Sequence, residues 1–236
     1  MKKILFIILA ITVISCNSNN NKNLSSPDGK ISLDFKIENG VAIYSVKKNN
    51  STIVNDSEIG ILFSDGTDLS SNLSVKSSNQ KSFNEDWHPL YGEEEKINNH
   101  YNELKISLTN QKNEFDVIFR AYDDGIAFKY VVPEQKNFSN YDIIDEKTEF
   151  NLSSKDSALW IPAFSYRRYE FLHAFSSVDD ISKEFFSKHV EDISYDTLGI
   201  DAAHTPLTIK MNDGSFISIH EAVSYTHLTL PTSFLV

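Results

Sequence analysis

Several features that are absent from the sequence exclude whole classes of function. Its 236 residues include one cysteine, Cys16, so an intramolecular disulfide is excluded. It has no Gly-rich phosphate loop, no Cys or His metal cluster and no G-x-S-x-G nucleophile motif. Basic residues are also too few for a nucleic-acid surface, because the formal net charge is −11, or −13 without Lys2 and Lys3. We therefore expect no nucleic-acid partner and favour a neutral ligand, such as a sugar, or a cationic one.

The first apolar run, Ile4–Ile14, follows two lysines and is too short to span a bilayer comfortably. With Ser15 and Cys16 after it, the stretch MKKILFIILAITVISC resembles a bacterial lipoprotein signal; a buried cysteine in a leader is the plainer alternative. We predict a signal peptide at residues 1–15, lipidation at Cys16 and a flexible tether at 16–23. The protein would then be a lipid-anchored periplasmic or outer-membrane lipoprotein, with the membrane as a partner through the anchor.

The remaining sequence is poor in helical periodicity and rich in alternating apolar residues, which is typical of half-buried strands. Seven segments show this pattern: ISLDFKI, VAIYSV, ELKISL, FDVIFRAY, IAFKYVV, LTIKM and SFISIHEA. Turn signals separate them, among them Pro27-Asp28-Gly29 and Asp213-Gly214. Only Val178–Val190 has the acidic start and basic end of a short helix. The pattern predicts an all-β fold, a large antiparallel β-sandwich with at most one short helix.

Three clusters of polar residues are candidates for chemistry. Residues 93–95 are consecutive glutamates near His100, although such a run is usually a solvated loop and adjacent strand residues point to opposite faces. Glu170, beside Tyr169 and two arginines, is either a ligand for a hard cation such as calcium or part of a surface salt-bridge patch. His220 and Glu221 end an apolar strand, where a polar pair can simply form the rim of a sheet.

The order of short motifs along the chain resembles the N-terminal domain of family-97 glycoside hydrolases, the bacterial α-glucosidases and α-galactosidases. The motifs that carry the resemblance are Leu24–Gly29, Trp87–Glu94, Asn99–Leu104, Phe119–Tyr130, Thr148–Phe150, Trp160–Pro162, Tyr169-Glu170, Thr205-Pro206 and Asp213–Ala222. Each is short, but together they follow the family order from about Leu24 to Ala222. We therefore expect a sandwich domain at 24–222.

The resemblance implies a mutarotase-like super-sandwich that precedes a TIM barrel. In the family the barrel supplies the catalytic carboxylates for α-linked oligosaccharides and most ligands of a calcium ion, and the sandwich contributes one glutamate to that ion. By motif position this ligand is Glu170, with Glu221 as a second choice and His220 as a residue facing the same cleft. The window Trp87–Leu104 would be an interface segment, with its asparagines and His100 satisfying backbone groups of a long connection.

The sequence departs from the family after Ala222, where it changes to VSYTHLTLPTSFLV. We expect residues 223–236 not to be native and the chain to be a fragment without its barrel. Ordinary glycoside hydrolysis needs two placed carboxyl groups, so the chain alone should be inactive, with no catalytic residue of its own. The alternative is a stand-alone carbohydrate-binding lipoprotein. An active mutarotase is disfavoured, because His220 and Glu221 are adjacent and would point to opposite faces of a strand.

Overall fold

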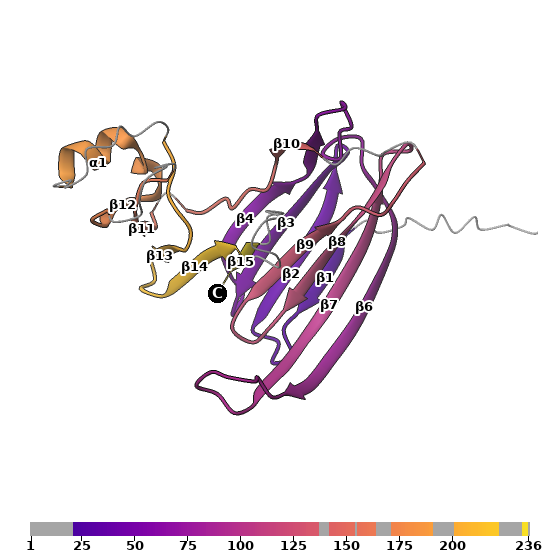
Figure 1. Ribbon diagram of the computed structural model, residues 1–236, viewed down its shortest axis with the longest axis horizontal. Helices are drawn as coiled ribbons and strands as arrows, with labels where there is room; N and C mark the ends of the chain where they lie inside the picture. The colour runs from indigo at the N-terminus through magenta and orange to yellow at the C-terminus, as the bar shows by residue number, and fades with distance from the viewer. Residues whose placement is uncertain are drawn as a thin grey trace, which may run out of the picture.

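The computed structural model describes residues 21–136, 142–153, 155–163, 171–190, 201–221 and 233–235. Its first sheet is an antiparallel meander of strands that are consecutive in sequence (Figure 1). The strands are β1 (Lys22–Ser25), β2 (Ile31–Glu38), β3 (Val41–Lys48) and β4 (Ser51–Ile59). Strand β1 thus begins two residues before the expected start of the domain at Leu24.

The second sheet is antiparallel throughout and has nine strands. In spatial order they are β12 (Ala174–Ser177), β11 (Ser157–Trp160), β13 (Leu207–Lys210), β14 (Phe216–Glu221), β15 (Ser233–Leu235), β9 (Ile126–Val131), β8 (Glu114–Ala121), β7 (Ile97–Thr109) and β6 (Ser74–Trp87). A separate pair joins β10 (Ile143–Glu146) to β5 (Ile61–Phe63).

The core lies between the first sheet and the β7–β9 part of the second, and it follows from strict alternation along the strands. In β2 the buried positions are Ile31, Leu33 and Phe35, while β8 buries every second residue from Phe115 to Ala121. Each of these two strands therefore presents one apolar face to the opposite sheet and one polar face outward. The β-sandwich predicted from the sequence is confirmed.

The helix predicted at Val178–Val190 is present in two pieces, the 3₁₀ turn η1 (Val178–Asp180) and the helix α1 (Lys183–His189). Ser182 interrupts them because its hydroxyl oxygen accepts a hydrogen bond from the Phe185 N–H at 3.1 Å, which caps α1. The buried face of α1 presents Phe186, whose ring centroid lies 5.7 Å from that of Trp160. We call β11–β14 with α1 the small module; Figure 1 shows it at one end of the molecule.

Each of the seven predicted segments overlaps a strand, in order β2, β3, β7, β8, β9, β13 and β14. Gly29 and Gly214 have φ of +74° and +86°, as their predicted turns require. In the described part of the chain, no helix has the length and apolar character needed to cross a membrane.

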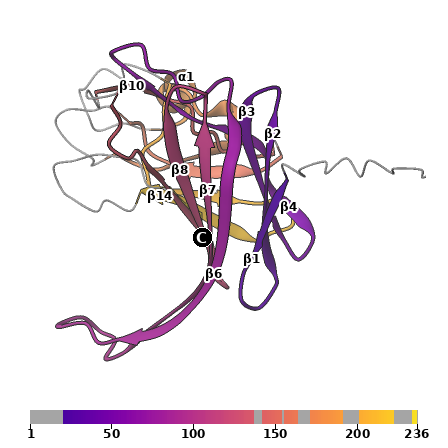
Figure 2. The same cartoon turned by 90° about the vertical axis from the view of Figure 1, so that its right-hand side faces the viewer.

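The hairpin formed by β6 and β7 is much longer than the strands beside it, and its far end extends past the sandwich (Figure 2). We call its distal part, residues 82–102, the arm. Strand β6 is exposed at almost every position, and it is the outermost strand of its sheet. The arm is therefore held mainly by its own cross-strand contacts rather than by the sandwich core.

Candidate functional site

The hollow that contains the predicted residues His220 and Glu221 lies where β14 approaches β10. Its volume is about 400 Å³. The residues that line it are Glu146, Thr148, Phe150, Leu152, Val178, Ala203, Thr205, Leu207, Ile219, His220 and Glu221. Most of this wall is apolar and a few polar groups converge on it, which is the usual composition of a small-molecule site.

Glu146 is the most perturbed group of this hollow. It ends β10, and the Thr148 hydroxyl donates a hydrogen bond to its Oε1. Thr148 is in turn hydrogen-bonded to the phenol of Tyr130, at 2.7 Å between the oxygens. Burial, and after it the charge of Glu221, raise the pKa of Glu146, and burial also raises the pKa of Tyr130. The site thus holds a carboxyl group that retains its proton more readily than an ordinary glutamate.

His220 and Glu221 both contribute to this lining, although they are neighbours in β14. The burial pattern places Glu221 on the same face as Ile217 and Ile219, and His220 on the other face. Glu221 is exposed and His220 is half-buried. The arrangement offers two carboxyl groups and an imidazole beside apolar side chains, which suits hydroxyl groups together with the C–H faces of a sugar.

A substitution of Glu146 tests this description. A carboxyl group whose pKa is raised on folding favours the folded state below its ordinary pKa and destabilises it as pH rises through that range. We expect Glu146→Gln to unfold at a higher temperature than the wild type at pH 7, and the difference to vanish near pH 4. Thermal unfolding by circular dichroism at both pH values measures this. A variant that is less stable at pH 7 would contradict a half-buried carboxyl group whose pKa is raised by burial.

The other predicted site residues have different placements. Glu170 and Cys16 lie outside the described residues, so the predicted calcium ligand and lipidation site stay predictions. Glutamates 93–95 form an exposed segment of the loop between β6 and β7, as a solvated loop would. Within the described ranges, no group of three His, Cys, Asp or Glu side chains is arranged to hold a metal ion.

The window Trp87–Leu104 is a connection only in part, since residues 88–96 join β6 to β7 and the residues after them form a strand. Its last part, residues 97–104, belongs to strand β7, which pairs with β6 in a continuous ladder from Trp87 opposite Ile97 to Gln80 opposite Leu104. Its asparagine side chains mostly bond to side chains of β6: Asn98 donates to Asn84 and Asp86, and Asn99 donates to Glu85. Asn102 does reach a backbone group, the Ser25 carbonyl, at 2.8 Å. The expected role in satisfying backbone groups is therefore wrong for Asn98 and Asn99.

Sequence reasoning missed Glu146, Thr148 as its partner, and Tyr130. These residues come together because β10 pairs with β5, a contact between segments about 80 residues apart in sequence. Thr148 was noted only as part of a family motif. The local sequence around Glu146 contains no signal for its burial, since neither alternation nor charge distinguishes it from the exposed Asp145.

A family model described as "Glycosyl-hydrolase 97 N-terminal" matches residues 24–232. The chain belongs to this family. The match continues past Ala222 and includes most of the segment that we expected not to be native.

Two curated relatives share limited identity with the chain. A retaining alpha-galactosidase from Bacteroides thetaiotaomicron is 30% identical over 139 residues, which are 58% of this chain and 20% of that protein. A probable retaining alpha-galactosidase from Streptomyces bingchenggensis is 26% identical over 145 residues, 61% of this chain and 21% of that protein. The chain thus spans about a fifth of the curated relatives that it matches.

Longer enzymes of known structure contain a part with the same fold as this chain. A family-97 enzyme from Pseudoalteromonas sp. strain K8, in complex with panose, has a TM-score of 0.74 and 29% identity, covering 90% of this chain and 31% of that one. The same enzyme in complex with acarbose gives the same values. A beta-arabinopyranosidase, at 17% identity and a TM-score of 0.70, shares the fold alone.

Proposed function

We propose that this chain is the N-terminal, non-catalytic sandwich of a longer, calcium-dependent α-glycoside hydrolase of the α-galactosidase or α-glucosidase type. In that protein it would bind carbohydrate at the edge of the active site and pack against a catalytic TIM barrel. One observation carries the proposal: the match to the family's N-terminal model covers nearly the whole chain, yet the chain spans less than a third of the solved relative.

The hollow at Glu146 and Glu221 is consistent with a role in carbohydrate binding. Its apolar wall, with Phe150 and Ile219, can pack on the C–H face of a sugar ring, and its carboxyl groups can bond to hydroxyls. Catalysis itself we assign to the barrel, as the family resemblance implies. Glycosidase activity in the 236-residue chain alone, lost on Glu146→Gln, would contradict this assignment.

The length and location of the native product test the proposal directly. Since 90% of this chain corresponds to 31% of the solved enzyme, the native protein should be about three times as long as this chain. An antibody against the sandwich should detect that longer product in whole cells, and it should partition with detergent if Cys16 carries the lipid anchor that we propose. A product of only 236 residues that binds α-linked oligosaccharides would instead support a stand-alone carbohydrate-binding lipoprotein.

Calcium dependence forms a separate part of the proposal. By the family resemblance, the barrel would supply most ligands of the calcium ion and Glu170 would supply one from the sandwich. Calcium is first removed from the full-length protein with a chelator. When calcium is then added at 100 times its dissociation constant, we expect the free energy of unfolding to rise by about 2.7 kcal/mol.

The substitution Glu170→Gln should weaken that stabilisation by calcium much more than Glu221→Gln does. Thermal unfolding with and without calcium measures both variants. If the two variants respond equally to calcium, or if only Glu221→Gln has an effect, the assignment to Glu170 is wrong.

A further inference from the structure

The arm carries the most exposed group of large apolar side chains in the described structure. Leu90 is 93% exposed, Tyr91 is 87% exposed and Trp87 is 50% exposed, all within five consecutive positions. Other exposed apolar side chains are dispersed over β10 and the small module: Ile144, Leu159, Leu172, Phe175 and Phe216. Grouped exposed apolar side chains of this kind are typical of interaction surfaces.

The strand pair behind this tip is braced by polar side chains across the ladder. Asn98 Nδ2 donates to Asn84 Oδ1 at 2.9 Å and to Asp86 Oδ1 at 2.8 Å, and Lys96 forms an ion pair with Asp86 at 2.7 Å. Nearer the sandwich, the Ser82 hydroxyl donates to Asn102 at 2.6 Å. These bonds contribute little stability individually in water, but together they fix the register and direction of the hairpin.

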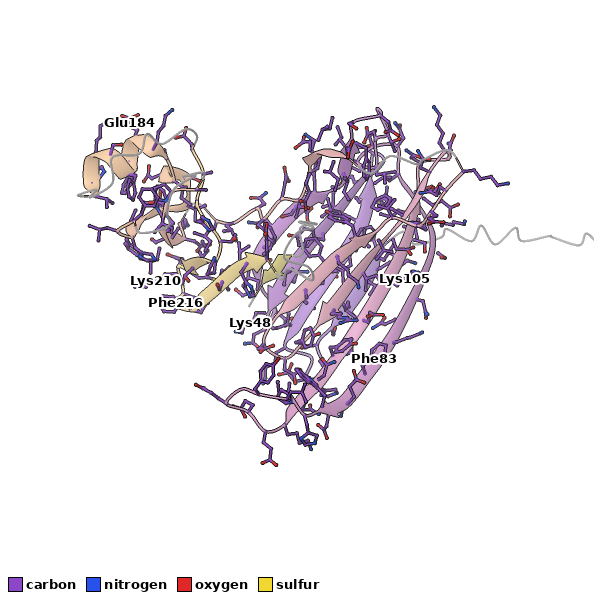
Figure 3. The ribbon with its side chains drawn as sticks, in the orientation of Figure 1. Lys48, Phe83, Lys105, Glu184, Lys210 and Phe216 are labelled. Carbon is purple, nitrogen blue, oxygen red and sulfur yellow. The ribbon has the colours of Figure 1, made fainter. Side chains whose placement is uncertain are left out.

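The base of the arm is fixed to the sandwich through contacts between aromatic rings. The ring centroids of Phe83 and Tyr101 are 4.9 Å apart, and those of Tyr101 and Tyr122 are 5.1 Å apart. The Arg120 guanidinium lies 4.5 Å from the Tyr101 centroid and bonds to Glu103 at 2.9 Å. Figure 3 shows Phe83 on this part of the hairpin. The tip is therefore presented at a defined position, at low entropic cost for binding.

We propose that the arm is a clamp whose tip, formed by Trp87, Leu90 and Tyr91, inserts into an apolar recess on the catalytic part of the longer polypeptide. The inference rests on the proposed function, and it names the surface through which the sandwich holds its partner. The occupant follows from length: more than two thirds of the solved relative lies beyond the part that this chain matches. A hairpin that extends past the sandwich is placed to reach a neighbouring domain.

The charges of the arm indicate the charge that we expect on the partner surface. Residues 82–102 include five carboxylates, at Glu85, Asp86 and 93–95, against the single Lys96. An apolar tip with an acidic rim fits a recess bordered by arginine or lysine. A sugar is a poorer occupant, because Leu90 offers no ring face for stacking and is the most exposed of the three side chains.

Hydroxyl-radical footprinting of the wild-type protein, read by mass spectrometry, tests the clamp without any substitution. Oxidation of Trp87, Leu90 and Tyr91 is compared between the 236-residue chain and the full-length product, with circular dichroism confirming that the chain is folded. We expect a severalfold loss of oxidation at all three residues in the full-length protein. Equal oxidation in a confirmed full-length product overturns the clamp while leaving the proposed function intact. If no longer product exists, the proposed function fails first, and with it the clamp.

Matched double variants separate the arm from the apolar surface of the small module. In the full-length protein, Trp87→Ala with Tyr91→Ala should raise the rate of proteolytic separation of sandwich and barrel about tenfold, because truncating central aromatic anchors is costly. Phe175→Ala with Phe216→Ala removes similarly exposed rings from the small module, where Figure 3 shows Phe216 beside Lys210, and should leave that rate unchanged. If the Phe175→Ala, Phe216→Ala variant separated faster than the Trp87→Ala, Tyr91→Ala variant, the contact with the barrel would lie on the small module.

A final measurement addresses the sugar occupant. Maltoheptaose is added to the 236-residue chain, and acrylamide quenching of Trp87 is recorded, with Trp87→Phe giving the contribution of the buried Trp160. We expect no change in quenching. Protection of Trp87 by the oligosaccharide would overturn the clamp and identify the tip as a sugar platform.

Discussion

Replacing Phe119 with alanine should destabilise the sandwich by about 4 kcal/mol, the largest effect that we expect from a single substitution. Phe119 is fully buried in the middle of β8 and forms the centre of an aromatic cluster. Its ring centroid lies 6.0 Å from that of Phe35, 6.1 Å from that of Tyr44 and 5.6 Å from that of Phe128. Because these rings come from both sheets, the cavity left by Phe119 cannot close by movement of one strand.

Urea unfolding measures this loss as a lower midpoint at an unchanged slope. Since a domain of this kind has a total stability of about 5–15 kcal/mol, the variant can lose much of its folded population at 37 °C. Phe216→Ala is the matched control, because Phe216 is 62% exposed and its removal should change stability by less than about 0.5 kcal/mol. Equal effects of the two substitutions would mean that the two sheets do not share the core described for them.

Replacing Gly60 with alanine should cost about 2–3 kcal/mol for a different reason. Gly60 connects β4 to β5, and an added Cβ would lie 2.4 Å from the Ser70 Cβ, 2.6 Å from the Ser70 Cα and 3.1 Å from the Leu69 carbonyl oxygen. The Ser70 backbone cannot withdraw easily, since its N–H and hydroxyl both bond to Asp68 Oδ1 at 2.7 Å. Gly60 itself is fixed by the bond from Lys147 N–H to its carbonyl.

A double-mutant cycle identifies the clash. Ser70→Gly removes the nearer atom, so Gly60→Ala should cost less in a Ser70→Gly background than in the wild type, although the contact with the Ser70 Cα keeps part of the penalty. Gly66→Ala is a useful comparison, because its added Cβ meets no atom within 4 Å and any cost there comes from a φ of +85°. Additive effects of Gly60→Ala and Ser70→Gly would show that the close approach does not decide the stability at Gly60.

The strands that could be predicted from the sequence are those with one buried and one solvated face. In β2 and β8 this geometry produces alternation, and both were predicted. Strand β6 is exposed on both faces, and apolar and polar residues do not alternate in its sequence, SVKSSNQKSFNEDW. Its pairing with β7 depends on cross-strand polar bonds instead. The helix was predicted as one piece because the N-cap bond of Ser182 is invisible to periodicity.

The candidate site was predictable only in part. The strand end at His220 and Glu221 was found, because a polar pair after an apolar strand stands out locally. Glu146 was not found, since its burial arises from the pairing of β10 with β5 and from the approach of β14, none of which leaves a local pattern. Contacts between distant segments decide which ordinary carboxyl group becomes perturbed.

The sequence order of the strands has a consequence for synthesis on the ribosome. Both β1–β4 and β6–β9 are meanders of consecutive strands, and their facing sides supply the aromatic cluster around Phe119. Every partner needed for that cluster has left the ribosome once the chain has been made and extruded as far as β9. The sandwich half can therefore form while the rest of the chain is still being made, and β14 joins the second sheet only after a long delay. Nascent chains arrested after β9 would already protect the β8 amides from hydrogen exchange.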